Sequence, residues 1–208
     1  MDINNLILIF FLISFGTLFY KYFILIISKY SPKLLIDDQL KKPQAFHVTP
    51  TPIVGGLGIF FSFIIVHLYF SLFKNIVFSE YLSFCTLFFF LGFVDDIKIN
   101  FSSKIRLALM IVFLILLVKY NNFFLEKTGI EFLNNWIENS ELFSLAFVCL
   151  CFLFVLNGAN LIDGYNGLLV IHSLIISVNL FFINYLNGNS DLALFLFLVI
   201  LILINFLI

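Results

Sequence analysis

Long runs of apolar residues, separated by short polar stretches, fill the sequence from end to end. Most runs reach the roughly 17 to 25 residues with which an α-helix crosses a hydrocarbon core of about 30 Å. All are expected to be helices, because no other open structure satisfies its backbone hydrogen bonds in lipid. The pattern predicts about seven spans, at 4–27, 53–73, 76–94, 105–118, 142–156, 168–186 and 192–208.

Composition excludes a water-soluble domain. The chain has 208 residues, of which 62% are apolar and 11% are charged, whereas soluble proteins carry about 25% charged residues. We therefore expect an all-α, polytopic integral membrane protein that forms a single transmembrane domain over residues 1–208. The net charge of −1 comes without a basic stripe, which predicts a bilayer but no nucleic acid as partner.

The distribution of basic residues orients the predicted helices. Successive spans reverse direction, so the gaps near 28–52, 95–104 and 157–167 share one side of the membrane. These gaps and their margins hold more Lys and Arg than the others, which places them in the cytoplasm by the positive-inside rule. The gap at 119–141, with several glutamates and Trp136, then faces outward as a short amphipathic piece. The basic residues on the cytoplasmic side are Lys29, Lys33, Lys41, Lys42, Lys98, Lys104 and Arg106, against Lys74, Lys119 and Lys127 on the other side.

The first cytoplasmic gap combines a histidine with proline and glycine. Pro50 and Pro52 stiffen the chain, and Gly55 and Gly56 allow another backbone or a ligand to come close at the start of a span. Two interpretations remain open for this segment. It is either a rigid loop followed by a glycine-rich helix-packing face, with His47 in solvent, or part of a binding site.

The second gap opens with two adjacent carboxylates. Asp95 and Asp96 follow an apolar run, and Lys104 and Arg106 begin the next span. Acids at a helix C-terminus and bases at an N-terminus both oppose the helix dipole, by about 0.3 to 1 kcal/mol each at exposed sites. The positive-inside rule accounts for the bases but not for the acids. A divalent metal, a proton-accepting role or an ion pair with a nearby lysine would each account for them.

The third gap is rich in Asn, Asp and Gly. Asn157, Asn160 and Asp163 are spaced three residues apart, so on a continuing helical turn they share one face. A helix cap and turn also suit this composition, and both interpretations can hold together. Amide and carboxylate oxygens are suitable ligands for Mg²⁺.

The three gaps together resemble the polyprenyl-phosphate N-acetylhexosamine-1-phosphate transferases of glycosyltransferase family 4. These membrane enzymes move a sugar 1-phosphate from a UDP-sugar to a lipid phosphate with Mg²⁺ at the cytoplasmic face. The segment from His47 to Gly56 is similar to the family pattern H-x-x-P-x-P-x-x-G-G, and the segment from Gly92 to Asp96 to its G-x-x-D-D. Residues 157–168 match N-x-x-N-x-x-D-G-x-x-G-L, the most specific of the three.

The resemblance implies roles for the polar residues of the second and third gaps. Asp95 would be the base that deprotonates or orients the lipid phosphate, and Asp96 would help to hold the metal and phosphates. Asn160 would be a Mg²⁺ ligand, with Mn²⁺ as the alternative ion. Asp163 and Asn157 would position the nucleotide sugar or the surroundings of the metal.

Substrate contacts follow from the same resemblance. Thr51, Gly55 and Gly56 would line the nucleotide site, and Lys104 with Arg106 would attract the phosphates. His47 is more typical of the branch that uses UDP-N-acetylhexosamines for surface polysaccharides, including lipopolysaccharide, than of the branch that builds the peptidoglycan precursor. The implied partners are a UDP-N-acetylhexosamine, polyprenyl phosphate and the bilayer of the cell membrane, with a homodimer left open.

The sequence also departs from the family pattern. Ala45 and Ile53 stand where basic residues are common in the family, so Lys41 or Lys42 would have to substitute. Family members have about ten or eleven spans and a later loop with a metal-binding Asp, so the chain is expected to represent the N-terminal part of such an enzyme. Two alternatives are an inactive truncated remnant and a transporter with an ion path through Asp95, Asp96, Asp163 and His172.

Overall fold

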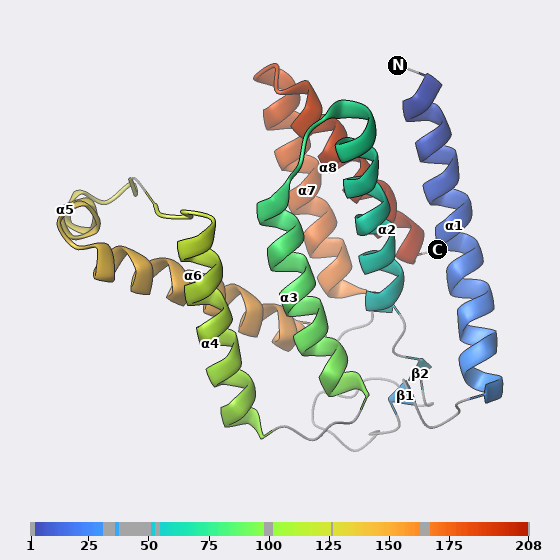
Figure 1. Cartoon of the computed structure of the whole chain (residues 1–208), viewed down its shortest axis with the longest axis horizontal. Coiled ribbons are helices and arrows are strands. Elements are labelled where there is room, and N and C mark those ends of the chain that lie inside the picture. The colour runs from blue at the N-terminus through green and yellow to red at the C-terminus, as the bar shows by residue number, and fades with distance from the viewer. Residues whose placement is uncertain are drawn as a thin grey trace. The chain divides into compact units, whose positions relative to one another are not determined.

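The computed structural model describes residues 3–30, 36–37, 51–52, 55–97, 102–125, 127–162 and 167–207. Almost all of them are helical (Figure 1). A two-residue antiparallel pair joins β1 (Ile36–Asp37) to β2 (Thr51–Pro52). The helices are α1 (Ile3–Tyr30), α2 (Gly55–Tyr69) with the π-helical turn η1 (Phe70–Lys74), α3 (Ser79–Asp96), α4 (Ser103–Tyr120), α5 (Glu131–Asn139), α6 (Glu141–Ile162), α7 (Leu168–Leu186) and α8 (Ser190–Leu207).

Every apolar run that predicts a span is a helix in the structure, so the all-helical membrane fold is confirmed. By length and composition, four described segments can cross a membrane: Gly55–Lys74, Glu141–Ala159, Leu168–Leu186 and Ser190–Leu207. The apolar parts of α1 and α3, Asn5–Gly16 and Ser79–Val94, are shorter. α4 carries Lys104, Arg106 and Lys119 near its two ends. Crossing by these last three helices stays a prediction.

The helices divide into two compact units, residues 1–78 with 162–208 and residues 79–161. We call them unit 1 and unit 2. The prediction of a single transmembrane domain over the whole chain remains untested by this division. Unit 1 contains α1, α2, α7 and α8, and within it α8 packs against the other three helices. α1 and α8 run in one direction and α2 and α7 in the other (Figure 1).

An aromatic core holds one half of unit 1 together. Phe70 and Leu198 are fully buried, and the Phe70 ring lies 5.3 Å from that of Phe78 and 5.8 Å from that of Phe195. His67 is buried against the same rings, with its Nε2 atom 2.9 Å from the carbonyl oxygen of Phe78. Burial among large rings fixes these side chains, because protein interiors are packed as densely as organic crystals.

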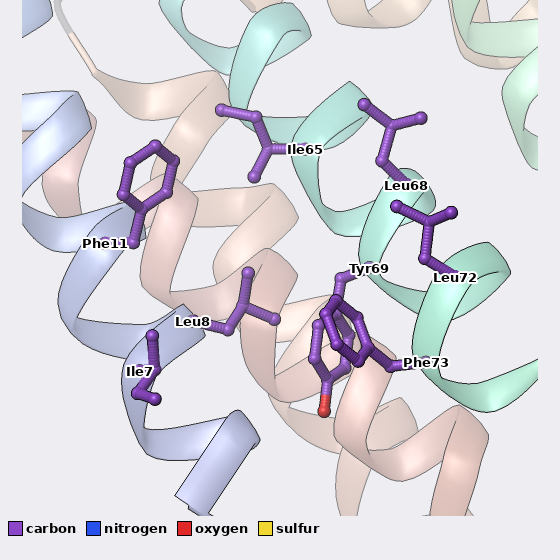
Figure 2. Close-up of a pocket in the computed structure, with 8 residues that line it drawn as sticks. All are labelled: Ile7, Leu8, Phe11, Ile65, Leu68, Tyr69, Leu72 and Phe73. Carbon is purple, nitrogen blue, oxygen red and sulfur yellow. The ribbon is translucent and has the colours of Figure 1, made fainter.

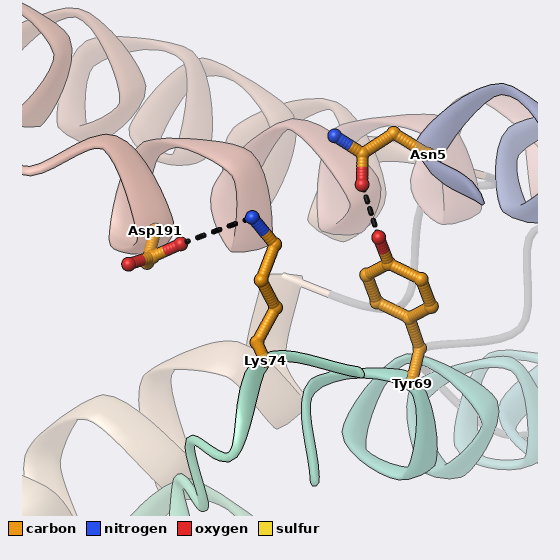
Figure 3. Close-up of polar contacts among 4 residues, drawn as sticks. All are labelled: Asn5, Tyr69, Lys74 and Asp191. Carbon is orange, nitrogen blue, oxygen red and sulfur yellow. Dashed lines mark hydrogen bonds and ion pairs between the residues drawn. The ribbon is translucent and has the colours of Figure 1, made fainter. Parts of the chain in front are cut away.

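Polar contacts reinforce the same end of unit 1 (Figure 3). The Tyr69 hydroxyl donates to Oδ1 of Asn5, and this buried pair joins α2 to α1. Lys74 is the last residue of η1, and its Nζ atom lies 3.7 Å from Oδ1 of Asp191 in the first turn of α8. η1 then closes at Asn75, which has the left-handed backbone conformation that Asn tolerates better than most residues.

Close helix contacts at small residues hold the opposite end of unit 1. A Cβ atom on Gly16 of α1 would lie 1.9 Å from Nδ2 of Asn205. The same Asn205 amide donates to the carbonyl oxygens of Leu12 and Ile13, both at 3.3 Å. The start of α2 touches the end of α8 as well, since a Cβ atom on Gly55 would lie 2.2 Å from the Phe206 ring.

Unit 2 is built on the antiparallel pair of α3 and α4. Leu114 and Val118 of α4 are fully buried, against Val148 and Cys149 of α6. α6 runs across the pair of helices rather than alongside it (Figure 1). The short amphipathic piece expected in the 119–141 gap contains a helix, α5, which exposes Trp136 and buries Ile137.

Candidate functional site

Asp95 and Asp96 are the last two residues of α3. The backbone turns there, with the N–H of Ile97 donating to the carbonyl oxygen of Phe93 at 3.1 Å. After the loop, α4 begins at Ser103, and the side chain of Ser102 caps it by accepting from the N–H of Ile105 at 3.4 Å. A serine at this position satisfies a helix N–H that has no partner within the helix. The chain thus reverses direction directly after the two aspartates.

Lys104 and Arg106 lie in the first turns of α4, at the same end of the helix pair as the aspartates. The opposite end is fixed by the amide of Asn121, which donates to Oγ of Ser83 at 3.2 Å. Because that bond joins the end of α4 to the start of α3, the two helices are antiparallel. The backbone of unit 2 therefore gathers two acids and two bases at one end of a helix pair.

The two bases differ in their surroundings. Lys104 is exposed, whereas Arg106 is half-buried. Both oppose the dipole of α4, as Asp95 and Asp96 oppose that of α3. Opposite charges at a shared end offset this cost, and an anion among the two bases would offset it further. The arrangement can attract a phosphate group and place a carboxylate beside it.

The Asn-rich segment is the end of α6. α6 continues to Ile162, six residues beyond the predicted end of that span, so Asn157 and Asn160 stand at positions i and i+3 of one helix, as the spacing predicts. Asn157 is exposed, and its amide donates to the carbonyl oxygen of Leu153 at 2.9 Å. Asn179 and Asn184 of α7 make the same bond to their own helix at 2.8 and 2.9 Å, so this bond is not specific to a site.

The first of the three motif-bearing segments is only partly described. Thr51 lies in β2, where its backbone pairs with Asp37, a residue that belongs to none of the three motifs. The signal was an acidic pair, Asp37 and Asp38, directly after three apolar residues, as at Asp95 and Asp96. Gly55 and Gly56 begin α2, and they differ. A Cβ atom on Gly55 would meet Phe206, whereas one on Gly56 would meet nothing within 4 Å.

Helix packing therefore accounts for Gly55, and Gly56 remains the better candidate for a ligand contact. His47 and Asp163 lie outside the described residues, as do the side chains of Thr51, Asp95, Asp96 and Asn160. The described part of the predicted site divides between the units. Thr51, Gly55 and Gly56 belong to unit 1, and Asp95, Asp96, Lys104, Arg106, Asn157 and Asn160 to unit 2.

The sequence offers oxygen ligands suitable for Mg²⁺, but the described residues contain no cluster of metal-binding side chains. No group of three or more His, Cys, Asp or Glu side chains lies together within the described residues. The predicted donors are an amide oxygen of Asn160 and a carboxylate of Asp163, and such hard oxygen ligands suit Mg²⁺ or Mn²⁺. The magnesium site stays a prediction.

Apolar grooves between the described helices were not foreseen from the sequence. One, of about 340 Å³, lies between α1 and α2, and Figure 2 shows Phe11, Leu68 and Phe73 on its walls. The second, of about 200 Å³, lies between α3 and α4 and includes Arg106 in its lining. Grooves of this kind depend on how side chains of two helices meet, which the apolar pattern of either helix alone does not reveal.

Comparison with known proteins finds a matching family and several similar proteins. The family model described as glycosyl transferase family 4 matches residues 78–208. The chain is similar to a phospho-N-acetylmuramoyl-pentapeptide-transferase of Buchnera aphidicola subsp. Baizongia pistaciae, at 27% identity over 80% of this chain and 52% of that protein. It is also similar to proteins of the same name from Blochmanniella floridana, at 24% identity over 84% and 53%, and Prochlorococcus marinus subsp. pastoris, at 29% over 82% and 52%.

Each of these matches extends over about four fifths of this chain. The chain spans about half the length of the curated relatives it matches. No solved structure matches it.

Proposed function

The chain belongs to glycosyl transferase family 4, and on that premise we propose that it transfers a phospho-N-acetylhexosamine from a UDP-sugar to polyprenyl phosphate. The reaction would release UMP at the cytoplasmic face of the cell membrane and begin a lipid-linked cell-surface polymer. One observation carries the proposal. The α3–α4 pair brings Asp95, Asp96, Lys104 and Arg106 to a single helix end, which is a suitable place for a phosphate that must be both bound and deprotonated.

The net chemistry is a displacement at phosphorus. An oxygen of the lipid phosphate forms a bond to the phosphorus that carries the sugar, the bond from this phosphorus to the bridging oxygen breaks, and UMP leaves with that oxygen. Such transfers need positioning and charge neutralisation more than covalent help from the protein. Asp95 accepts the proton of the lipid phosphate or orients its attacking oxygen, and Lys104 and Arg106 offset negative charge on the phosphates.

Asn160 and Asp163 are the proposed ligands of Mg²⁺, or of Mn²⁺ in its place. Bound there, the ion would supply further charge neutralisation to the diphosphate. Asp96 and Asn157 complete the polar surroundings, and His47, Thr51 and Gly56 would contact the nucleotide sugar. Because the Phe206 ring packs against Gly55, a ligand would have less room at this glycine than at Gly56.

The donor sugar has two candidates. His47 in its motif favours an unsubstituted UDP-N-acetylhexosamine. The named relatives favour a second candidate, a muramoyl donor that carries a pentapeptide, because that group is in their name. Parallel assays with the two donors distinguish these candidates, since only the accepted one will release UMP.

The test is UMP release by the purified chain in lipid, with a UDP-sugar, polyprenyl phosphate and Mg²⁺. We expect Asp95→Asn to lower the rate by about 10² to 10⁴, the usual contribution of a positioned general base. Asp191→Asn is the matched control, because Asp191 pairs with Lys74 in unit 1, whereas Asp95 belongs to unit 2, and the substitution should leave the rate unchanged. Release that survives Asp95→Asn contradicts the assignment of the base.

Absence of release from the wild-type chain would instead favour the remnant alternative. The transporter alternative predicts solute uptake by reconstituted vesicles without any nucleotide. Transporters commonly place ionisable groups near the membrane midplane on broken helices, whereas Asp95 and Asp96 end α3. That position favours the transferase.

A further inference from the structure

The groove between α3 and α4 is apolar along its length and charged at one end. Its volume is about 200 Å³. The lining positions follow helical spacing, so each helix presents one continuous face. α3 contributes Leu87, Phe90, Leu91 and Val94, and α4 contributes Arg106, Leu109 and Phe113.

The charged end of the groove is the end that carries the aspartates. Val94 directly precedes Asp95, and Arg106 is half-buried in the lining near the start of α4. A charged side chain beside the apolar lining of a predicted membrane span is costly to keep, and by default it points to a functional site. The groove therefore suits a long apolar molecule with an anionic group at one end.

The charge separates this groove from two other grooves among the described residues. The groove between α1 and α2 (Figure 2) and the one beside α6 near Phe124 have no charged residue among the described residues that line them. Any apolar groove in a membrane is covered by lipid, but only a charged end can select a lipid by its head group. Arg is suited to this task, because its planar guanidinium forms paired hydrogen bonds with phosphate oxygens.

We propose that the α3–α4 groove binds the polyprenyl tail of the acceptor lipid, with the lipid phosphate at Arg106. This inference rests on the proposed function and adds to it the place of the lipid. From Leu87 to Val94 the helix rises roughly 10 Å, so the groove holds the part of the tail next to the phosphate. Anchored in this way, the phosphate stands at the end of α3 that Asp95 and Asp96 close.

The experiment is photocrosslinking of the purified 208-residue chain in lipid nanodiscs. The probe is a polyprenyl phosphate with a diazirine in its first isoprene units, and mass spectrometry of the digested protein locates the label. We expect label on α3 and α4 that excess polyprenyl phosphate removes. Polyprenol, which lacks the phosphate, should compete at least about tenfold less well, because it forfeits a charge-assisted contact worth that much in affinity.

Three variants sharpen the result. Arg106→Gln should weaken competition by polyprenyl phosphate about tenfold while leaving competition by polyprenol unchanged. Leu91→Trp should fill the groove and abolish the label. Leu68→Trp is the matched control, because it fills the groove between α1 and α2 and should leave the label on α3 and α4 intact.

The outcomes also separate this inference from the proposed function. Label that polyprenol or a phosphatidylglycerol removes as well as polyprenyl phosphate does would make the groove an ordinary lipid surface and overturn the inference, as would label confined to α1 and α2. If the chain releases UMP but the label is unselective or confined to α1 and α2, the assignment of the lipid to the α3–α4 groove is wrong and the transferase function stands. Selective label on α3 and α4 without UMP release overturns the transferase and leaves a lipid-phosphate site. The comparison of polyprenyl phosphate with polyprenol uses the wild-type chain, so the test remains valid even if a variant misfolds.

Discussion

In unit 1 the glycines Gly16 and Gly55 lie where α8 comes too close for a larger side chain, whereas in unit 2 Gly92 and Gly158 have no atom within 4 Å of the position a Cβ would take. The first pair serves helix packing, which in membranes depends on small residues that let helices approach. The second pair has no packing reason in the described structure. Gly92 belongs to the segment that ends in Asp95 and Asp96, and Gly158 lies between Asn157 and Asn160.

The two units also differ in their buried cores. Unit 1 encloses Phe70, Leu198 and Val66 completely, and hydrogen bonds from Tyr69 and Asn205 join its helices. In unit 2 the helix α6 leaves large side chains such as Phe154 exposed. Among the described residues, unit 2, which holds most of the predicted chemistry, thus has the smaller buried core, although both units leave large side chains exposed. A site for a lipid and a nucleotide sugar needs surface that its own helices do not cover.

The largest expected contrast concerns two phenylalanines. Phe70→Ala removes a fully buried ring in unit 1, and we expect the free energy of unfolding to fall by about 3 to 5 kcal/mol. Phe154→Ala removes a ring of α6 that is 77% exposed, and the change should stay within about 0.5 kcal/mol. Denaturant unfolding in mixed micelles, followed by circular dichroism, measures both. Equal losses would contradict the contrast between a buried ring in unit 1 and an exposed ring in unit 2.

Glycine substitutions give the next contrast. In Gly55→Ala the new methyl group meets the Phe206 ring, and overpacking of this kind costs about 1 to 3 kcal/mol. Gly158→Ala adds a methyl group to open space inside α6 and should stabilise the helix by about 0.5 to 1 kcal/mol. Gly56→Ala, one residue from Gly55, is the local control and should not destabilise unit 1.

The same unfolding measurements decide the comparison. If Gly55→Ala proves harmless, helix packing does not explain that glycine, and the ligand-binding interpretation regains weight. UMP release provides an independent reading for Gly158→Ala, because activity lost without any loss of stability would assign Gly158 to a ligand.

The sequence predicted the helices well because each is specified by its own apolar run. It also predicted an amphipathic piece in the gap that contains α5, although not its helical form, and it predicted that Asn157 and Asn160 share a helix face. The contacts of Gly16 with Asn205 and of Gly55 with Phe206 join residues more than 150 positions apart, and no local pattern announces them. The same holds for the bond between Asn5 and Tyr69.

The candidate site was predicted in part. The gathering of Asp95, Asp96, Lys104 and Arg106 follows from two helices and a short loop, which a sequence reading can anticipate. Arg106 illustrates the part that could not be predicted. It is half-buried in a groove that it lines together with Leu91 and Val94 of the neighbouring helix. The positive-inside rule alone assigns it only to the cytoplasmic side of the membrane.

Asn205 provides the smallest and most specific test of how unit 1 is closed. Its amide donates to the carbonyl oxygens of Leu12 and Ile13 across Gly16. Hydrogen bonds between membrane helices contribute about 0.6 kcal/mol on average and about 1.7 at most, so Asn205→Ala should lower the free energy of unfolding by that amount. Asn179→Ala is the matched control, because the Asn179 amide donates to the carbonyl oxygen of Ile175 in its own helix, and its loss should cost less.

A double-mutant cycle with Gly16→Ala isolates the contact itself. Alone, Gly16→Ala should displace the Asn205 amide, since its Cβ would lie 1.9 Å from Nδ2, and should cost about as much as Asn205→Ala. In the Asn205→Ala background the same methyl group has space, and the second substitution should be neutral or stabilising. The two costs would then fail to add, as expected for residues in contact. Additive costs would mean that α1 and α8 are held together elsewhere, and that the close packing of unit 1 does not depend on Gly16.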